Sequence, residues 1–339
     1  MKKINVGILG ATGAVGQEML KVMAERHFPV AELRLFGSER SAGKKVVYEG
    51  QEVTIEATTV ERFDGLDLLL GAVDNDLAKI YIPEAVKRGV HVVDNSSAFR
   101  LDPEVPLVVP EVNPEDIAKS KGLIANPNCA TIIALVAVAP LHKEAHIKRM
   151  VLSTYQAVSG AGAAGITALE EEVKRADGER VEGSVFPYPI AYNLIPQIGG
   201  FNDMGYTSEE MKLQNEGRKI LHDDALRVSC TCVRVPIQRS HSESITLEFD
   251  DALSLEKAKA LLEKAPGVKF WDDPEAKHYP MPILTSNQDL VYVGRLRRDL
   301  SALPEEMDKS MVLFCCADQV RKGAATNAVQ IAEILFKTR

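Results

Sequence analysis

A glycine-rich turn between an apolar strand and a helix is the feature that most constrains the fold of this chain. Residues 4–9 read INVGIL, which is typical of a buried strand, and residues 10–16 read GATGAVG. Helical spacing of apolar residues then runs from 15 to 24. Small residues in such a turn let backbone N–H groups approach a pyrophosphate at the positive end of the helix. The turn predicts a dinucleotide-binding α/β sheet; because its spacing is not the commoner G-x-G-x-x-G, a tight turn without a ligand is the alternative.

The first third of the chain continues this alternation of strands and helices. We expect further strands at 32–36, 66–72 and 90–93, and a helix at 77–88 that Gly89 ends. Strands that alternate with helices over short connections form a doubly wound parallel sheet.

A second domain is predicted after about residue 150. Its expected strands are 150–155, 229–235 and 245–249. A stretch rich in proline, glycine and aromatic residues, 185–206, is too long for a simple connection and is therefore a candidate for a functional or interfacial role. A closing helix at 324–337 is expected to pack back on the first domain.

Composition narrows the classes of protein that fit. The chain has 339 residues, of which 45% are apolar and 26% charged, as in a folded globular protein. A formal net charge of −8 argues against a nucleic-acid partner, and the longest apolar stretch, 130–141, is too short to cross a membrane. Five cysteines are too few for a disulfide framework, so we expect a protein of the reducing cytoplasm without a signal peptide.

The end of the second predicted strand bears on the choice of cofactor. Residues 37–41 read GSERS. An acidic residue at this place binds the ribose hydroxyls of NAD, and Glu39 leaves that cofactor open. Arg40 between two serines suits a 2′-phosphate better, so the sequence favours NADP.

Cys129 differs from the other cysteines in its setting. It follows Asn126-Pro127-Asn128 and precedes a long apolar run, which places it at a helix N-terminus. The N–H groups and dipole there stabilise a thiolate, so Cys129 is a candidate nucleophile; a small buried cysteine is the alternative. The remaining cysteines lie in two predicted strands with no zinc-binding spacing.

A nucleophilic cysteine needs an acid–base partner and a group that orients the substrate. The segment 233–242, VRVPIQRSHS, offers His241 and two arginines at the end of a strand. Arginine binds carboxylates and phosphates through two parallel hydrogen bonds. His142 and His146 have metal-binding spacing, but a solvated or helix-capping role is favoured and no metal is predicted.

Taken together, five segments closely resemble the aspartate-β-semialdehyde dehydrogenase family over nearly the whole chain. These segments are 10–16, 96–100 (SSAFR), 126–129 (NPNC), Gln156 with 159–162 (SGAG), and 234–241. The resemblance implies a Rossmann-like NADP-binding domain, 1–128 with the C-terminal helix 321–339, and an α+β catalytic and dimerisation domain, 129–320. It also implies a cytoplasmic homodimer that makes aspartate semialdehyde for the lysine, threonine and methionine pathways.

The resemblance also implies roles for individual residues. Cys129 is similar to the nucleophile that forms an acyl-thioester, Gln156 to the residue that holds the substrate, and His241 to the general acid–base. Arg234 is similar to the partner of the substrate α-carboxylate, and Glu209 to that of its α-amine. The implied phosphate-site residues are Arg100, Lys212 and Asn128. The implied cofactor contacts are Thr12, Gly13, Ala14, Val15, Arg40, Ser41, Ser159, Gly160 and Gln319, with Asn327 as an alternative to Gln319.

One departure from the family pattern is the segment 73–76, VDND, where many members have a serine- or glycine-rich loop, so no cofactor contact is assigned there. Two other functions stay open. Reduction of N-acetyl-γ-glutamyl phosphate is one, although Glu209 favours a substrate with a free amine. A catalytically silent NADP-binding protein is the other, and the joint presence of Cys129, Gln156 and His241 argues against it.

Overall fold

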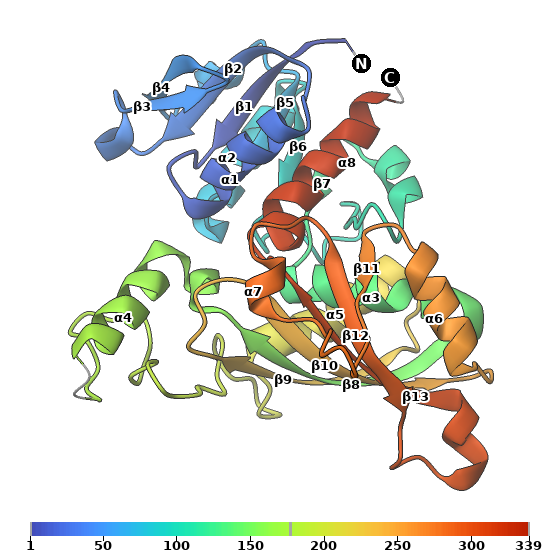
Figure 1. The fold of residues 1–339 in the computed structure, drawn as a ribbon. Coiled ribbons are helices and arrows are strands. Elements are labelled where there is room, and N and C mark those ends of the chain that lie inside the picture. Colours follow the sequence, from blue (N-terminus) through green and yellow to red (C-terminus); the bar gives the residue numbers. More distant parts are fainter. Residues whose placement is uncertain (1, 176–177, 338–339) are drawn as a thin grey trace. The chain divides into compact units, whose positions relative to one another are not determined.

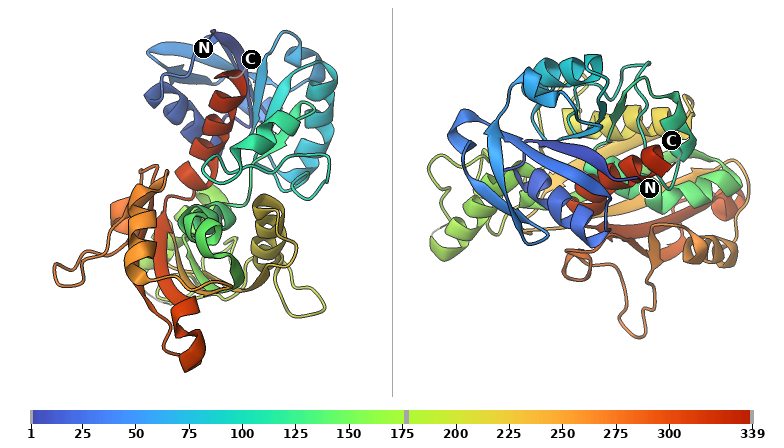
Figure 2. Two further views of the ribbon diagram at one scale, coloured as in Figure 1. Left: turned by 90° about the vertical axis from the view of Figure 1, so that its right-hand side faces the viewer. Right: turned by 90° about the horizontal axis from the view of Figure 1, so that it is seen from above.

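The computed structural model describes residues 2–175 and 178–337, and divides the chain into two compact units. Figures 1 and 2 show their ribbons. The N-terminal unit comprises Met1–Asn128 and Ala324–Arg339, and the C-terminal unit comprises Cys129–Gly323. Among the described residues, no helix is both long and apolar enough to span a membrane.

The N-terminal unit contains a seven-stranded sheet in the order β3-β4-β2-β1-β5-β6-β7. Its strands are β1 (Ile4–Leu9), β2 (Val30–Gly37), β3 (Lys45–Tyr48), β4 (Gln51–Ala57), β5 (Leu68–Gly71), β6 (His91–Asp94) and β7 (Leu123–Ala125). Its helices are α1 (Ala14–Glu25), α2 (Asn75–Lys87) and α8 (Thr326–Lys337). All neighbouring strands are parallel except β3 and β4, which form an antiparallel hairpin. The sheet is therefore mixed, where a wholly parallel one was expected.

Side chains on the two faces of this sheet feed two separate cores. On one face, Ile8 and Leu70 pack with Met19 of α1 and Ile331 of α8. On the other face, Leu9, Phe36 and Leu69 pack with Ala78 and Ile82 of α2. Both faces of the central strands are buried, which explains their continuous apolar sequences. Helix α8, from the end of the chain, thus completes the core of the N-terminal unit.

The C-terminal unit contains a six-stranded sheet in the order β11-β12-β13-β10-β8-β9. Its strands are β8 (Ile147–Gln156), β9 (Arg227–Arg234), β10 (His241–Phe249), β11 (Val268–Phe270), β12 (Val291–Arg298) and β13 (Ser310–Ala317). Its helices are α3 (Cys129–Ala145), α4 (Gly162–Arg175), α5 (Ser208–Leu221), α6 (Leu255–Lys264) and α7 (Pro282–Thr285).

Helices α3, α5 and α6 lie along one face of this second sheet (Figure 1). Alternate residues of β10, Ile245, Leu247 and Phe249, are buried on that face, whereas Thr246 and Glu248 are half-buried on the other. Strand β10 begins at His241, earlier than the predicted start at 245, so His241 lies in the sheet and not in a loop. The predicted closing helix, by contrast, begins two residues later than expected, at Thr326, because a π-helical turn occupies Arg321–Ala325.

The long segment before α5 is held by a buried acid of α4. The carboxylate of Glu172, 3% exposed, accepts hydrogen bonds from the N–H groups of Ile190 (2.6 Å) and Ala191 (2.9 Å). The segment nevertheless exposes large apolar side chains: Val185, Tyr188, Tyr192, Leu194, Phe201 and Met204. The segment is thus anchored at Ile190 and Ala191 and exposes apolar side chains on both sides of that anchor, as surfaces that bind other proteins often do.

Candidate catalytic and cofactor-binding sites

The glycine turn of the N-terminal unit leaves the start of α1 accessible to a ligand. Gly13 is the N-cap and supplies no capping side chain, and the first turn contains no acidic residue. A Cβ on Gly16 would come within 2.4 Å of the Gly10 carbonyl oxygen, and one on Gly10 within 2.3 Å of the Ala72 carbonyl oxygen. Both positions therefore require glycine. The resulting helix N-terminus, bare of side chains, suits a pyrophosphate.

A cavity of about 530 Å³ opens beside this turn. It is lined by Leu9, Gly10, Thr12, Gly13, Gly37, Ser38, Glu39, Thr58, Ala72, Val73, Asp74, Leu77 and Tyr81. The structure thus places the predicted Thr12 and Gly13 in the cavity wall, with Ala14 and Val15 in the first turn of α1. Arg40 is exposed in the 3-10 turn that follows β2, and buried Ser41 lies next to it with its Oγ 3.3 Å from that of Ser38.

The segment 73–76, to which no cofactor contact was assigned, also contributes to this cavity through Val73 and Asp74. Asp74 is the N-cap of α2, and its carboxylate accepts the N–H groups of Asp76 and Leu77. The signal for this placement is an acidic capping residue directly after a buried strand.

Arg100 of the N-terminal unit is buried and anchored to the main chain. Its Nε donates to the Asn126 carbonyl oxygen at 2.9 Å, and its Nη2 to the Asn95 carbonyl oxygen at 2.7 Å. The same asparagine, Asn126, accepts a side-chain hydrogen bond from Asn327 at 2.7 Å. Asn327 is fully buried and also bonds Val108, so its amide supports the chain just before Asn128.

Cys129 is the first residue of α3 and the only half-buried cysteine; the other four, all within the described part of the chain, are fully buried thiols. A Cβ on Gly323 would lie 2.9 Å from the Cβ of Cys129, so the π-helical turn packs directly against it. The helix N-terminus favours a thiolate at this position.

Three strand ends bring the other predicted catalytic residues together in the C-terminal unit. Gln156 of β8 pairs in register with Arg234 of β9, and its Nε2 lies 3.4 Å from Nε2 of His241. The same amide nitrogen donates to Oε1 of Glu209 at 3.2 Å, while Oε2 of Glu209 pairs with Lys212 Nζ at 2.8 Å. All five side chains therefore belong to one cluster.

Charge and burial set the state of this cluster. Arg234 is 6% exposed and donates from Nη1 to the Ala157 carbonyl oxygen at 2.6 Å. Burial lowers the pKa of Arg234, and the negative charges of Cys129 and Glu209 partly offset that effect. The guanidinium remains charged, since its ordinary pKa exceeds 12. It is a cation next to the nucleophile, in a setting where a substrate anion would bind strongly.

His241 is fully buried and neutral. Burial, followed by the charge of Arg234, lowers the pKa of His241 to about 3. Its Nδ1 accepts the N–H of Ala157 at 3.0 Å. A neutral ring that accepts at Nδ1 carries its proton on Nε2, so His241 presents an N–H donor to the cluster.

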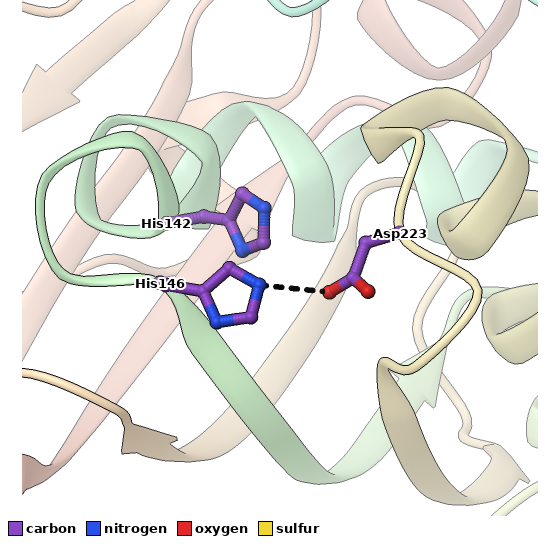
Figure 3. Close-up of side chains that lie close together, drawn as sticks. All are labelled: His142, His146 and Asp223. Atoms are coloured by element: carbon purple, nitrogen blue, oxygen red, sulfur yellow. Dashed lines mark ion pairs between the residues drawn. The ribbon is translucent and has the colours of Figure 1, made fainter.

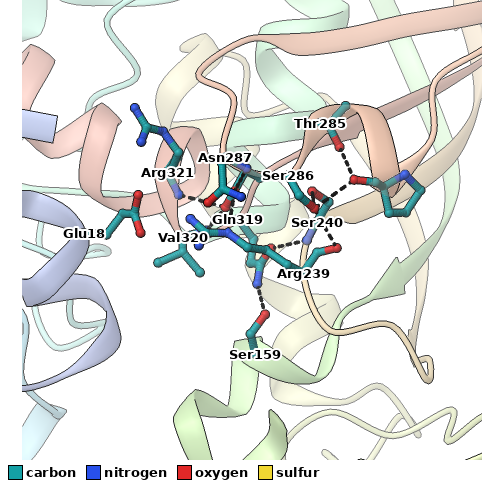
Figure 4. A network of polar contacts seen from close by, with 12 residues as sticks. Glu18, Ser159, Arg239, Ser240, Thr285, Ser286, Asn287, Gln319, Val320 and Arg321 are labelled. Carbon is teal, nitrogen blue, oxygen red and sulfur yellow. Dashed lines mark hydrogen bonds and ion pairs between the residues drawn. The ribbon is translucent and has the colours of Figure 1, made fainter. Parts of the chain in front are cut away.

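Two further predicted residues of this unit, Ser159 and Gln319, belong to a polar network that includes Ser240, the residue before His241 (Figure 4). Gln319 Nε2 donates to Ser159 Oγ, and Gln319 Oε1 accepts the N–H of Ser240 at 2.8 Å. Ser240 has a φ of +76°, a strained value that this contact helps to hold. A Cβ on Gly160 would lie 2.7 Å from Arg234 Nη1, so a larger residue there would displace the guanidinium.

Sequence reasoning missed the residue that anchors this network. Asp318 is fully buried, and its Oδ2 accepts hydrogen bonds from Arg239 Nε at 2.5 Å and from the N–H of Asn287 at 2.6 Å. Its Oδ1 accepts the N–H groups of Val320 and Arg321. Two of its partners, Arg239 and Asn287, come from separate loops, so no local pattern reveals that this acid is buried and connects them.

The side chains of His142, His146 and Asp223 form a second cluster (Figure 3). His142 Nδ1 accepts the N–H of Ile147 at 3.2 Å, which caps the end of α3. His146 Nε2 lies 3.2 Å from Asp223 Oδ2, and its Nδ1 contacts Asp250. His142 thus has a capping contact, whereas His146 pairs with two carboxylates, and the hydrogen bond to Asp250 raises the pKa of His146.

Comparison with known proteins identifies the family. The family model for the NAD binding domain of semialdehyde dehydrogenases matches residues 5–120, and the model for their dimerisation domain matches residues 138–322. The aspartate-semialdehyde dehydrogenases of Aquifex aeolicus and Bacillus subtilis are 49% and 45% identical to this chain, with 98% of both chains covered in each case.

Solved structures agree with these sequence matches. Aspartate semialdehyde dehydrogenase II of Vibrio cholerae, in complex with ASA, superposes with a TM-score of 0.94 at 43% identity, over 99% of both chains. The enzyme of Candida albicans, solved with NADP, superposes with a TM-score of 0.76 at 26% identity, also over 99% of both chains. The chain therefore belongs to the aspartate-semialdehyde dehydrogenase family of oxidoreductases.

Proposed function

We propose that this chain interconverts β-aspartyl phosphate and aspartate semialdehyde, with NADP as cofactor and inorganic phosphate as the second product or substrate. The observation that carries this proposal is the cluster at the strand ends of the C-terminal unit. It combines a cysteine at a helix N-terminus with a buried cation, a buried carboxylate and a neutral histidine. A substrate that carries an α-carboxylate and a free α-amine has the charges that this cluster complements.

The substrate contacts follow from charge. Arg234 is the proposed partner of the α-carboxylate and Glu209 that of the α-amine, because each is buried and of opposite charge to its ligand. Lys212, which pairs with Glu209, is the proposed phosphate contact of this unit. Arg100 and Asn128 of the N-terminal unit are assigned to phosphate by the family resemblance.

Cys129 is the proposed nucleophile. Its thiolate attacks the acyl carbon, an S–C bond forms, and the bond to the phosphate oxygen breaks with its electron pair leaving on phosphate. NADPH, when bound, supplies the hydride that reduces the resulting thioester. Collapse of the Cys129 thiohemiacetal then releases the aldehyde and restores the thiolate.

Without bound substrate, His241 is neutral, so it can donate a hydrogen bond but holds no extra proton to transfer. Its Nε2–H can donate a hydrogen bond to the oxyanion that develops on the acyl carbon, while Gln156 positions the substrate next to it. Burial is the main cause of the lowered pKa of His241 and the charge of Arg234 the second; an anion bound to Arg234 offsets this second cause, which favours the protonated ring. We propose that substrate binding in this way prepares His241 to act as the general acid, and then as the base in the collapse step.

The bare N-terminus of α1 and the adjacent cavity fit a dinucleotide. Thr12, Gly13, Ala14 and Val15 are the proposed contacts of the pyrophosphate. Arg40 and Ser41, in the turn after β2, are proposed to bind the 2′-phosphate, which would give NADP its preference over NAD. In the C-terminal unit the proposed cofactor contacts are Ser159, Gly160 and Gln319.

Assembly and location complete the proposal. The family model for the C-terminal unit is a dimerisation domain, and the exposed apolar segment before α5 offers a surface for it. We therefore propose a homodimer. We also propose a cytoplasmic location, in which four buried cysteines and a reactive one stay reduced.

The deciding experiment is the spectrophotometric measurement of NADPH formation from aspartate semialdehyde with and without inorganic phosphate. Phosphate-dependent formation is expected, together with its loss in Cys129→Ala. N-acetylglutamate semialdehyde serves as the matched alternative substrate. A higher kcat/KM for the acetylated aldehyde, or reduction of NADP that needs no phosphate, would contradict the proposal.

A further inference from the structure

A buried acid that the reaction does not use lies directly behind the catalytic cluster. Glu243 is 0% exposed, and both of its carboxylate oxygens lack a hydrogen-bond partner in the described part of the chain. It follows His241 by two positions in β10, so the two side chains share the face of the sheet that α3 covers. An orphaned buried carboxylate requires a physical explanation.

The strand register shows what surrounds it. Glu243 lies opposite Thr154 of β8 and opposite Cys315 of β13, and Thr154 in turn lies opposite Cys232 of β9. These four residues form a row one step behind Gln156, which is two positions after Thr154 in β8. Thr154 Oγ1 donates to Oε1 of Gln156 at 2.9 Å, so the row is already hydrogen-bonded to the cluster.

Among the described residues, no cation forms a hydrogen bond with either carboxylate oxygen of Glu243. Burial raises the pKa of Glu243 well above its usual range, and Cys232 raises it further. The charge of an ionised Glu243 would in turn raise the pKa values of three further buried thiols: Cys230, Cys315 and Cys316. His241, on the same strand, is neutral, and residues 130–141 of α3 include no charged side chain.

A neutral acid has one donor and needs one acceptor. Directly opposed residues of antiparallel strands have Cβ atoms about 4.5–5.5 Å apart, within reach of a glutamate that turns toward its partner. The Thr154 hydroxyl donates a hydrogen bond to Gln156, and the lone pairs on its oxygen can accept a second hydrogen bond. It is the oxygen acceptor on the strand opposite Glu243.

We propose that Glu243 is a protonated carboxylic acid whose O–H donates to Thr154, and that this bond fixes which end of the Gln156 amide faces the catalytic cluster. With the acid neutral, Thr154 must donate to the amide oxygen, so the amide NH₂ points to Glu209, as the structure shows. An ionised Glu243 would instead accept a hydrogen bond from the Thr154 hydroxyl. Thr154 would then accept from the amide NH₂, and the amide oxygen would face the Glu209 carboxylate. Glu243 is thus a positioning residue, and the inference rests on the role proposed above for Gln156.

Kinetics of matched variants test the positioning. Thr154→Val and Glu243→Leu each remove one link with an apolar side chain of similar size, and each should lower kcat about 5- to 10-fold with little change in KM, the loss expected for one buried hydrogen bond. Thr154→Ser and Glu243→Gln keep the groups that can form these hydrogen bonds, so both variants should have a kcat close to that of the wild type. The double variant Thr154→Val/Glu243→Leu should be no slower than either single variant, because both break the same chain.

Infrared difference spectroscopy between the wild type and Glu243→Gln tests the protonation state without reference to activity. The C=O stretching band of a protonated carboxylic acid, distinct from that of a carboxylate, should be present in the wild type at neutral pH and lost in the variant. Its absence would overturn the proposal.

Gln156→Ala distinguishes a failure of the role proposed for Gln156 from a failure of the positioning by Glu243. If this variant keeps wild-type kcat, the role proposed for the amide fails, while the infrared band still decides whether Glu243 holds a proton. If it is inactive while folded Thr154→Val and Glu243→Leu have wild-type kcat, or if their effects multiply in the double variant, the positioning by Glu243 is refuted.

Discussion

Replacement of Arg234 by lysine and by leucine separates two effects of one guanidinium. Arg234 is buried and uses Nη1 on the Ala157 carbonyl oxygen, which leaves its other N–H groups for a substrate carboxylate. Lysine keeps the charge but offers no planar fork, so it loses at least one charge-assisted hydrogen bond. At roughly 1.5–3 kcal/mol per such bond, KM for aspartate semialdehyde should rise about 10- to 150-fold in Arg234→Lys.

Leucine also removes the charge, and this has a separate consequence. Burial is the main cause that lowers the pKa of His241 to about 3, and the charge of Arg234 lowers it further, so Arg234→Leu should raise that pKa by the contribution of the charge alone. The acidic limb of the profile of kcat/KM against pH should therefore move to higher pH in Arg234→Leu and stay in place in Arg234→Lys. Initial rates of NADPH formation across the acidic and neutral range, with thermal melts to verify folding, measure both effects. A wild-type KM in Arg234→Lys, or the same acidic limb in all three proteins, would refute the reasoning.

Four further predictions follow from single contacts. Cys129→Ala should abolish turnover while NADP binding, measured by calorimetry, persists; residual phosphate-dependent turnover would exclude the thioester route. Lys212→Leu should raise KM for phosphate more than KM for the semialdehyde, and an equal rise in both would show that its pairing with Glu209 is its main role. Arg40→Ala should lower kcat/KM for NADP roughly 10- to 100-fold and leave that for NAD nearly unchanged, whereas equal losses would assign Arg40 to the loop alone. His146→Gln should lower the free energy of unfolding by no more than about 0.5 kcal/mol, since the side chain is half exposed. Because contact with Asp250 raises the pKa of His146, the loss should be full at acidic pH and vanish as pH rises through the raised pKa; a loss that grows with pH would contradict it.

The sequence was informative where the signal was local. The apolar run that follows Asn126-Pro127-Asn128 predicted a helix that starts near Cys129, and α3 begins at that residue. Glu209 and Lys212 are three positions apart in α5, a spacing that places side chains on one helix face, and the two form an ion pair.

The sequence did not predict features that depend on contacts between distant segments, or a turn that lacks the residues typical of its type. The β3–β4 hairpin was not predicted. Its turn residues, Glu49 and Gly50, both have positive φ, but the usual sequence signal for such a turn is Asn-Gly or Asp-Gly, and here a glutamate takes the first position. Asp318 and Glu243 were missed for another reason. Acidic residues are rarely fully buried, and the burial of these two becomes visible only when strands and loops that are remote in sequence come together.

The place of α8 has a consequence for synthesis of the chain. The N-terminal unit is made first, yet Val329, Ile331 and Leu335 at the far end complete its core against β1 and α1. About 200 residues separate its two parts, so the ribosome needs roughly 10–40 s to supply the missing helix. During that interval the C-terminal unit, which is continuous in sequence, can emerge and fold. The N-terminal unit can therefore complete its core only after α8 has been synthesised, when all of the C-terminal unit has already been translated.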